Sequence, residues 1–419
     1  MEYLEIIGEK AKRASENLAA LKEETVNAAL ERAAALIRKE SAYIKAENAK
    51  DLKNAQEKGL SAAFIDRLAV TDKVIESVAV GIEQVAKLTS PVGRLLYSYE
   101  NAEQGIDVKK IAVPFGVIGI IFESRPNVAA DAFALCFKTR NAVILRGGSD
   151  ALNSNAAIVS VIKTALKETG VDENAVALLT DVSHETAAKF MKLNKYLDLL
   201  IPRGGAGLIK TALKEATVPV IETGLGNCHV YVDESADAEM AANVIFNAKT
   251  QRYSVCNACE SLVIHSGALN SALPLIADRL AEKQVEIRCD ERAYAALKGR
   301  PFVTRASEED FYAEYGAAII SVKTVDSLSA AIEHINRCST HHSEAIITKD
   351  CKAAERFLNG VDSACVYYNA STRFSDGFVF GLGAEIGIST QKLHARGPMG
   401  LDALCTTKYV VKGDGAVRK

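Results

Sequence analysis

The sequence predicts an α/β fold with two doubly wound domains. Short uninterrupted apolar segments alternate with segments of helical periodicity between residues 117 and 221, and the same alternation returns from residue 228 onward. Continuous apolar strands separated by helices are typical of parallel sheets that are covered on both faces. With 419 residues the chain also exceeds what a single hydrophobic core usually supports, which favours two or three domains.

The first 90 residues predict a group of helices. This stretch is rich in Ala, Glu, Lys and Leu, and its apolar residues recur at helical spacing, as at Val26, Leu30 and Ile37. The first proline of the chain is Pro91, and the run Pro91-Val92-Gly93 predicts the end of the helical segment.

The segments 95–99 and 106–113 predict two strands that are joined through residues 101–105 into a hairpin. An isolated two-stranded hairpin is barely stable in water, so we expect it to extend another sheet, in this chain or in a second subunit. Residues 408–411 could provide one more strand.

The remaining elements follow in two alternating regions. In the first we expect strands at 117–122, 142–145, 176–179, 197–201 and 218–221, and helices at 128–139, 149–167, 184–194 and 207–215. Ser149 or Asp150 could cap the second of these helices. In the second region we expect strands at 228–232, 261–265, 317–322 and 344–348, and a helix at 237–248. A second α/β domain is therefore predicted to begin near residue 228.

The composition argues against several classes of protein. A net charge of −3 without a dense Lys/Arg run does not favour nucleic-acid binding. No apolar stretch approaches the ~20 residues of a membrane span, and the start Met1-Glu2-Tyr3 does not resemble a secretory signal. Nine scattered cysteines predict a reduced, cytoplasmic protein in which most thiols are unreactive core residues.

The segment 251–260 carries the most suggestive chemistry, because Cys256 and Cys259 have Cys-x-x-Cys spacing. A zinc site needs two further ligands, and no second cysteine pair or close histidine pair completes one, so no metal is expected. A redox-active disulfide fits poorly, because the motif does not open a helix after a first strand. Cys256 instead lies in a polar loop between a predicted helix and a predicted strand, where a nucleophile can meet a cleft.

Six further motifs accompany the Cys256 loop. They are Val113-Pro114-Phe115-Gly116-Val117-Ile118-Gly119, Phe122-Glu123-Ser124-Arg125-Pro126-Asn127, Ile201-Pro202-Arg203-Gly204-Gly205, Gly226-Asn227-Cys228-His229-Val230-Tyr231-Val232-Asp233, Gly381-Leu382-Gly383-Ala384-Glu385-Ile386-Gly387 and Gln391-Lys392-Leu393-His394-Ala395-Arg396-Gly397-Pro398-Met399-Gly400. In this order they resemble the aldehyde dehydrogenase superfamily, and within it the reductases that act on γ-glutamyl phosphate. The resemblance covers essentially the whole chain.

The resemblance also implies how the chain is organised into domains. Residues 1–92 and 116–227 would form a cofactor-binding domain with N-terminal helices, and residues 228–385 a catalytic domain that carries Cys256. Residues 93–115 and 400–419 would form an oligomerisation element, which implies a homodimer or homotetramer.

The implied reaction is the NADPH-dependent reduction of L-glutamyl 5-phosphate to L-glutamate 5-semialdehyde with release of phosphate, the second step of proline biosynthesis. The Cys256 thiolate would displace phosphate and form a thioester, which is then reduced. The amide of Asn127 and the backbone N–H of Cys256 would stabilise the oxyanion. An alternative for Asn127 is the N-cap of the helix that follows it. The unstable substrate would come from a separate glutamate 5-kinase.

Cationic side chains in or beside the matching motifs could bind the phosphate and α-carboxylate of the substrate: Arg125, Arg252, Arg373, His394 and Arg396. Each of them could equally form a structural ion pair.

The cofactor would lie at the carboxyl ends of the first sheet. By the resemblance, Arg146 takes the place of a basic residue of the superfamily and Ser149 the place of an acidic one. The loss of an acid that would bind the ribose 2′-hydroxyl, together with the presence of Arg146, favours the 2′-phosphate of NADPH over NADH. Gly204 and Gly205 could present bare N–H groups to a phosphate, or could form a tight turn only. Glu314 resembles the glutamate that holds the nicotinamide ribose, although its spacing departs from the family pattern.

Two rival functions remain open from the sequence. A hydrolytic aldehyde dehydrogenase would need a glutamate that activates water; Glu222 lies near that position, but its spacing does not match cleanly. A catalytically inactive binding subunit would make no use of Cys256 and Asn127 together. His229 could lie near the thiol or belong to the core.

Overall fold

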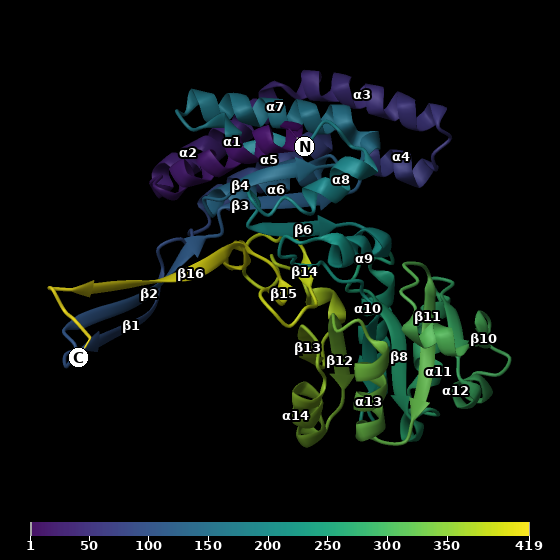
Figure 1. Ribbon diagram of the computed structural model, residues 1–419. Helices are drawn as coiled ribbons and strands as arrows, with labels where there is room; N and C mark the ends of the chain where they lie inside the picture. The colour runs from purple at the N-terminus through teal and green to yellow at the C-terminus, as the bar shows by residue number, and fades with distance from the viewer. Residues whose placement is uncertain (1, 419) are drawn as a thin grey trace. The chain divides into compact units, whose positions relative to one another are not determined.

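The computed structural model describes residues 2–418 and divides into two compact units. Unit 1 comprises Met1–Thr223, Gly381–Gly387 and Met399–Lys419, and unit 2 comprises Gly224–Phe380 and Ile388–Pro398. Each unit contains its own parallel sheet with helices (Figure 1). Within residues 2–418, no helix combines the length and the apolar character that crossing a membrane requires.

Unit 1 is built on a parallel four-stranded sheet of order β5-β4-β3-β6. Its strands are β3 (Val117–Phe122), β4 (Ala142–Arg146), β5 (Val176–Leu178) and β6 (Leu199–Arg203). Its helices are α1 (Glu2–Ala19), α2 (Glu23–Lys39), α3 (Ser41–Glu57), α4 (Ala62–Leu68), α5 (Asp72–Lys87), α6 (Asn127–Lys138), α7 (Leu152–Glu168), α8 (His184–Phe190) and α9 (Ala206–Glu215). Every residue of β3 is buried, as expected for a strand covered on both faces.

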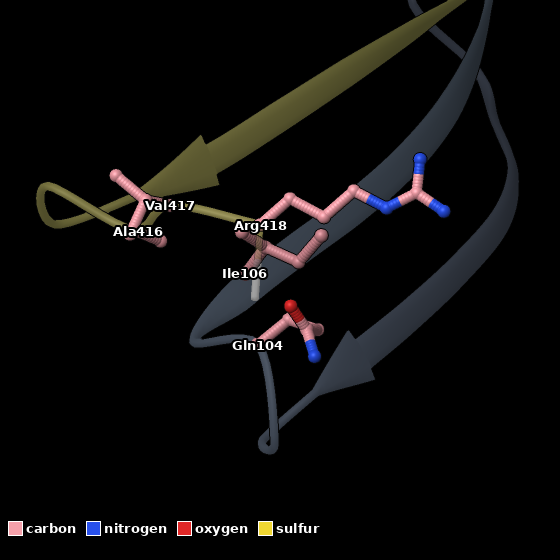
Figure 2. Close-up of a pocket in the computed structure, with 5 residues that line it drawn as sticks. All are labelled: Gln104, Ile106, Ala416, Val417 and Arg418. Carbon is pink, nitrogen blue, oxygen red and sulfur yellow. The ribbon is translucent and has the colours of Figure 1, made fainter.

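A separate three-stranded antiparallel sheet also belongs to unit 1. It has the order β1-β2-β16, from β1 (Leu95–Asn101), β2 (Ile106–Pro114) and β16 (Cys405–Gly413). The predicted hairpin and the predicted C-terminal strand are thus both confirmed, and they join one another. At the end of this sheet Gln104, Ile106 and residues 416–418 surround a shallow hollow (Figure 2).

Unit 2 contains a parallel seven-stranded sheet of order β10-β9-β11-β8-β7-β12-β13. Its strands are β7 (Cys228–Val232), β8 (Cys259–His265), β9 (Glu286–Cys289), β10 (Val303–Arg305), β11 (Ile319–Val325), β12 (Ser343–Ile347) and β13 (Cys365–Tyr368). Its helices are α10 (Ala238–Thr250), α11 (Leu273–Ala281), α12 (Glu291–Ala296), α13 (Leu328–Cys338) and α14 (Cys351–Gly360). The short strands β14 (Ile388–Ser389) and β15 (Gly397–Pro398) form a small antiparallel pair.

Two local predictions are wrong. Residues 218–221 make only a single bridge, from Val220 to Leu200, because Pro219 has no N–H to continue a ladder. Neither Ser149 nor Asp150 caps the long helix after β4: they lie in a short 3₁₀ turn, Ser149–Ala151. The carboxylate of Asp51 in α3 takes the capping role, accepting the backbone N–H groups of Asn153 at 3.2 Å and Ser154 at 2.8 Å.

Candidate active site

The Cys256 loop of unit 2 connects the end of α10 to the start of β8. Cys256 is half-buried, whereas Cys259 is fully buried in β8 beside its register partner Cys228. Burial raises the pKa of the Cys259 thiol to about 12, which leaves it protonated at neutral pH. Of the two cysteines in the motif, only Cys256 is accessible as a nucleophile. Across residues 2–418 no cluster of three His, Cys, Asp or Glu side chains could hold a metal ion.

Residues 226–228 pack against the backbone of Cys256. The Cys228 thiol donates a hydrogen bond to the carbonyl oxygen of Cys256, with 3.1 Å between sulfur and oxygen. Gly226 lies so close that a β-carbon on it would be 1.5 Å from the same oxygen. Asn227 fixes this segment in turn, donating to the carbonyl oxygens of Phe311 and Cys338 at 3.0 Å each. A side chain at position 226 is therefore incompatible with this backbone path.

The turn at residues 371–375 holds the other side of the loop. The side-chain amide of Asn257 donates to the carbonyl oxygen of Ser375 at 2.9 Å, and the Thr372 hydroxyl donates to the carbonyl oxygen of Asn257 at 2.8 Å. This turn carries Arg373, whose Nε donates to Oε1 of Gln251 at 2.9 Å. The cation is thereby fixed relative to the Cys256 loop.

Arg373 is electrostatically linked both to Cys256 and to a second predicted cation, Arg252. Desolvation lowers the pKa of Arg373, Cys256 opposes this effect by charge attraction, and Arg252 adds to it by repulsion. Arg252 itself is exposed. Two guanidinium groups close to one another, one of them attracted to the Cys256 sulfur, offer suitable partners for a bound anion.

The other predicted anion binders of unit 2 are less clearly placed. Arg396 pairs with Asp362, with 2.9 Å between Nη2 and Oδ1, and Lys392 pairs with the second oxygen of Asp362 at 2.6 Å. His394 is exposed, and its carbonyl oxygen accepts a bond from Gln391 at 2.6 Å. The alternative of a structural ion pair is therefore concrete for Arg396.

A buried ion pair lies at the two ends of the Cys256 loop. Lys249 in the last turn of α10 donates to Glu260 in β8 at 2.5 Å, and neither side chain has solvent exposure. Burial raises the pKa of Glu260 to about 7, against the charge and hydrogen bond of Lys249. The pair was not predicted from the sequence, although the opposite charges of Lys249 and Glu260 on either side of one loop were a visible signal.

The carboxylate of Glu314 accepts a hydrogen bond from the backbone N–H of Gly226. Desolvation raises the pKa of Glu314, and this bond opposes the rise. Glu314 thus contacts the same segment that supports Cys256, a link that the sequence did not predict.

His229 and Glu222 lie in different environments. His229 is fully buried, with Nδ1 3.0 Å from the carbonyl oxygen of Asn227 and 3.4 Å from Oε2 of the buried Glu344. This environment supports the core interpretation of His229. Glu222 is half-buried and belongs to unit 1.

In unit 1, Asn127 is the first residue of α6 and does not cap it, since the N-cap position is Pro126. The N-cap alternative for Asn127 is therefore wrong. Its Nδ2 donates to Oδ2 of Asp131, one turn further along the helix, at 3.0 Å. Arg125 is exposed in the loop that precedes α6.

The carboxyl ends of β3, β4 and β6 lie at one edge of the parallel sheet of unit 1, the edge at which such folds bind nucleotides. Arg146 ends β4, and its Nη2 donates to the carbonyl oxygen of Val182 at 2.5 Å. Ser149 is exposed nearby. The adjacent Asp150 is paired with Lys58 at 2.7 Å, and Lys58 was not predicted from the sequence.

The glycine turn after β6 leads into α9, with Gly205 as its N-cap. The backbone N–H of Gly205 donates to Oε1 of Glu123 at 2.7 Å, and a β-carbon on Gly204 would lie 2.7 Å from the same oxygen. In this structure the N-terminus of α9 is thus already bonded to a carboxylate, Glu123, which follows β3.

Comparison with known proteins decides the relationship. The model of the aldehyde dehydrogenase family matches residues 2–296. A protein of Lachnospira eligens named gamma-glutamyl phosphate reductase is 55% identical over 419 residues, which is 100% of both chains. The chain belongs to the aldehyde dehydrogenase family.

Solved structures agree with this membership. The crystal structure of gamma-glutamyl phosphate reductase from Thermotoga maritima has a TM-score of 0.97 at 44% identity, covering 99% of this chain and 100% of that one. An acetylating aldehyde dehydrogenase from Geobacillus thermoglucosidasius, 18% identical, has a TM-score of 0.68 over 100% of this chain and 98% of its own. The second match shows the fold alone, and it confirms the predicted fold class.

As a member of the aldehyde dehydrogenase family the chain uses a nicotinamide cofactor. The carboxyl edge of the sheet in unit 1 suits a nucleotide, because glycines follow β4 and β6 at that edge. A β-carbon on Gly147 would lie 2.4 Å from Nδ2 of Asn155, and one on Gly148 would lie 2.5 Å from the Ser124 hydroxyl. The backbone there is bare because the packing leaves no room for side chains.

Proposed function

We propose that this chain reduces L-glutamyl 5-phosphate to L-glutamate 5-semialdehyde with NADPH and releases phosphate, as the second step of proline biosynthesis. The observation that carries the proposal is the 55% identity to a named gamma-glutamyl phosphate reductase over the whole of both chains. Such a reaction requires an accessible thiol and a cation close to it, and the half-buried Cys256 with Arg373 supplies both.

In this proposal Cys256 is the acyl carrier. Its thiolate attacks the acyl carbon, a carbon–sulfur bond forms, and the bond to the phosphate oxygen breaks as phosphate leaves. When bound, the reduced nicotinamide supplies the hydride that converts the thioester to the level of a thiohemiacetal. The oxygen that carries the negative charge then re-forms the carbon–oxygen double bond as the carbon–sulfur bond breaks, which yields the aldehyde and restores the thiolate.

The developing oxyanion needs hydrogen-bond donors. We assign this role to the backbone N–H of Cys256 and to the side-chain amide of Asn127. Losing one donor of this kind typically slows an enzyme by about 10²–10³-fold.

The substrate carries a phosphate and an α-carboxylate, and both are suited to guanidinium groups. Arg373 and Arg252 are our first candidates, because Arg373 is attracted to Cys256 and Arg252 is close enough to Arg373 to repel it. We keep Arg125 and His394 as further candidates, while Arg396 has Asp362 as a partner.

We further propose NADPH over NADH. The pairing of Asp150 with Lys58 offsets the charge of the carboxylate that follows Ser149, so a 2′-phosphate would meet less repulsion from it. Arg146 and Ser149 remain the proposed cofactor residues, with Gly204, Gly205 and Glu314. For Gly204 and Gly205 to hold a phosphate, the carboxylate of Glu123 would have to move aside.

The three-stranded sheet of unit 1 is our proposed oligomerisation element. Large apolar side chains are exposed along it: Leu95, Leu96, Tyr97, Tyr99, Tyr409 and Val411. Large exposed apolar side chains on a small sheet favour association with a second copy, as a dimer or tetramer. We retain the division into a cofactor domain (1–92, 116–227), a catalytic domain (228–385) and this element (93–115, 400–419).

The pathway position implies a kinase that supplies the unstable acyl phosphate. We propose a functional link to a glutamate 5-kinase on that ground. All nine cysteines are free, which supports a reducing compartment such as the cytoplasm.

The test runs the reaction backwards. Purified protein is mixed with pyrroline-5-carboxylate and NADP, with and without inorganic phosphate, and NADPH absorbance is followed. We expect reduction of NADP only with phosphate present, and slower reduction of NAD. Activity that is independent of phosphate would instead indicate a hydrolytic aldehyde dehydrogenase, and a preference for NAD would reject the cofactor assignment alone.

A further inference from the structure

We infer that Asp131 is a positioning residue of the reaction, which orients the side-chain amide of Asn127 so that one N–H faces the oxyanion. The inference rests on the proposed function and on the proposed role of Asn127. It adds a residue that no family motif in the sequence contains.

The two residues lie one turn apart in α6. Nδ2 of Asn127 donates to Oδ2 of Asp131 at 3.0 Å. Residues four apart on a helix face the same side, so this bond needs no distortion of the backbone. Within residues 2–418, Asn127 is the hydrogen-bonding partner that the structure gives Asp131.

The bond decides which end of the amide faces which way. A side-chain amide has a nitrogen that donates two hydrogens and an oxygen that only accepts, and it can rotate to exchange them. An ionised carboxylate accepts only, so it must face the nitrogen. With one hydrogen directed to Asp131, the second hydrogen has a fixed direction. Without Asp131 the amide could turn its oxygen toward an oxyanion, which would repel it.

The environment leaves room for this role. Asn127 and Asp131 line a hollow of about 260 Å³ together with Pro126 and residues of α4 and α5. The amide is therefore not enclosed by packing on every side, and packing alone does not fix its rotation.

A purely structural role for Asp131 explains less. Desolvation raises the pKa of Asp131 to about 6, against the bond from Asn127 and the charge of Arg203. A carboxyl group in such a place costs stability unless it is neutralised, and groups of this kind are frequent at functional sites. A carboxylate in the first turn of a helix can accept hydrogen bonds from free backbone N–H groups. Asp131 lies beyond the first turn of α6, so it does not have that structural role.

The experiment is a double-mutant cycle on the phosphate-dependent assay. Asn127→Ala should lower kcat by about 10²-fold or more. Asp131→Ala should lower kcat by about 10-fold with KM nearly unchanged, as for other outer-shell partners that orient a reacting group. In the Asn127→Ala background the same change should alter kcat by less than about 2-fold. Asp131→Asn should recover much of the loss, because its amide oxygen can still accept from Asn127.

Two controls separate positioning from general damage. Asp51 is a buried carboxylate elsewhere in unit 1, and Asp51→Ala should combine with Asn127→Ala multiplicatively. The rate of Cys256 alkylation by iodoacetamide should stay within about 2-fold of wild type in every Asp131 variant, since the nucleophile is unchanged.

The outcomes are distinguishable. Multiplicative effects of Asp131→Ala and Asn127→Ala would overturn the inference and leave Asp131 a structural residue. An Asn127→Ala variant with wild-type kcat would also overturn it, while the proposed function would stand. Absence of phosphate-dependent activity in the wild type would reject the proposed function itself.

Discussion

The α-carbon of Gly226 lies against the carbonyl oxygen of Cys256, and a β-carbon at position 226 would be 1.5 Å from that oxygen. Such an overlap is with backbone, which cannot turn aside as a flexible side chain would. The Cys256 loop keeps its path only while position 226 has no side chain.

Gly226→Ala should therefore displace the Cys256 loop. A misplacement of about 1 Å at a reacting group can cost about 10²-fold in rate, so we expect kcat to fall by at least that factor. Gly207→Ala is the matched control, because a β-carbon at Gly207 meets no atom within 4 Å. The measurements are kcat in the phosphate-dependent assay and the thermal unfolding midpoint. Wild-type kcat in Gly226→Ala would contradict the tight contact.

The two cysteines of the Cys-x-x-Cys motif should behave differently. Cys256→Ala should abolish turnover, because no other thiol in the motif is accessible. Cys259→Ala should keep kcat within about 3-fold and lose about 1 kcal/mol of stability through the small cavity that it leaves. Steady-state kinetics and urea unfolding check both variants. Equal loss of turnover would indicate that the two thiols act together.

Removing one partner of the buried pair Lys249–Glu260 should lower the free energy of unfolding. Lys249→Met leaves a buried carboxylate without its partner, and such changes typically cost about 3–5 kcal/mol. The double variant Lys249→Met with Glu260→Met should recover most of that loss, because neither charge remains. Urea unfolding of the three proteins gives the comparison. A double variant no more stable than Lys249→Met would contradict the expected recovery.

Asp310 should make unit 2 sensitive to acid. Desolvation raises the pKa of Asp310, but bonds from Arg288, Ser307 and Tyr315 outweigh it and lower the pKa to about 2. A folded pKa below the unfolded value of about 3.9 contributes stability above pH 4, and the contribution disappears as the pH falls toward 2. Asp310→Asn should thus cost about 2 kcal/mol at pH 7. The difference from wild type should shrink between pH 4 and pH 2.5 in urea unfolding; a difference that is constant with pH would rule out the ionised carboxylate as its source.

The sequence predicted those parts of the fold that depend on local patterns. The uninterrupted apolar runs gave β3 and β7 with the bounds that the structure has. The strand at 218–221 failed because a single proline removes a donor that the apolar pattern does not reveal. The cap of α7 could not be predicted at all, since it comes from Asp51, which lies about a hundred residues earlier.

The site shows the same limit. Cys256 could be singled out from its neighbours in the sequence, because a motif and a loop position sufficed. The contact of Gly226 with Cys256 and the pairing of Asp150 with Lys58 arise from segments that only the fold brings together. Asp131 is different, since its spacing of four from Asn127 on one helix was readable, but the burial that gives it meaning was not.

Unit 1 is formed by segments that precede and follow the main part of unit 2 in the sequence, and this order has a consequence for the nascent chain. Residues 405–413, which form β16, leave the ribosome only after the whole of Gly224–Phe380 has been synthesised. Until then the edge of β2 that pairs with β16 has no partner, while the seven-stranded sheet of unit 2 can already form. The growing chain therefore carries an open strand edge beside exposed apolar side chains, which is a target for chaperones and a point where neighbouring nascent chains could entangle.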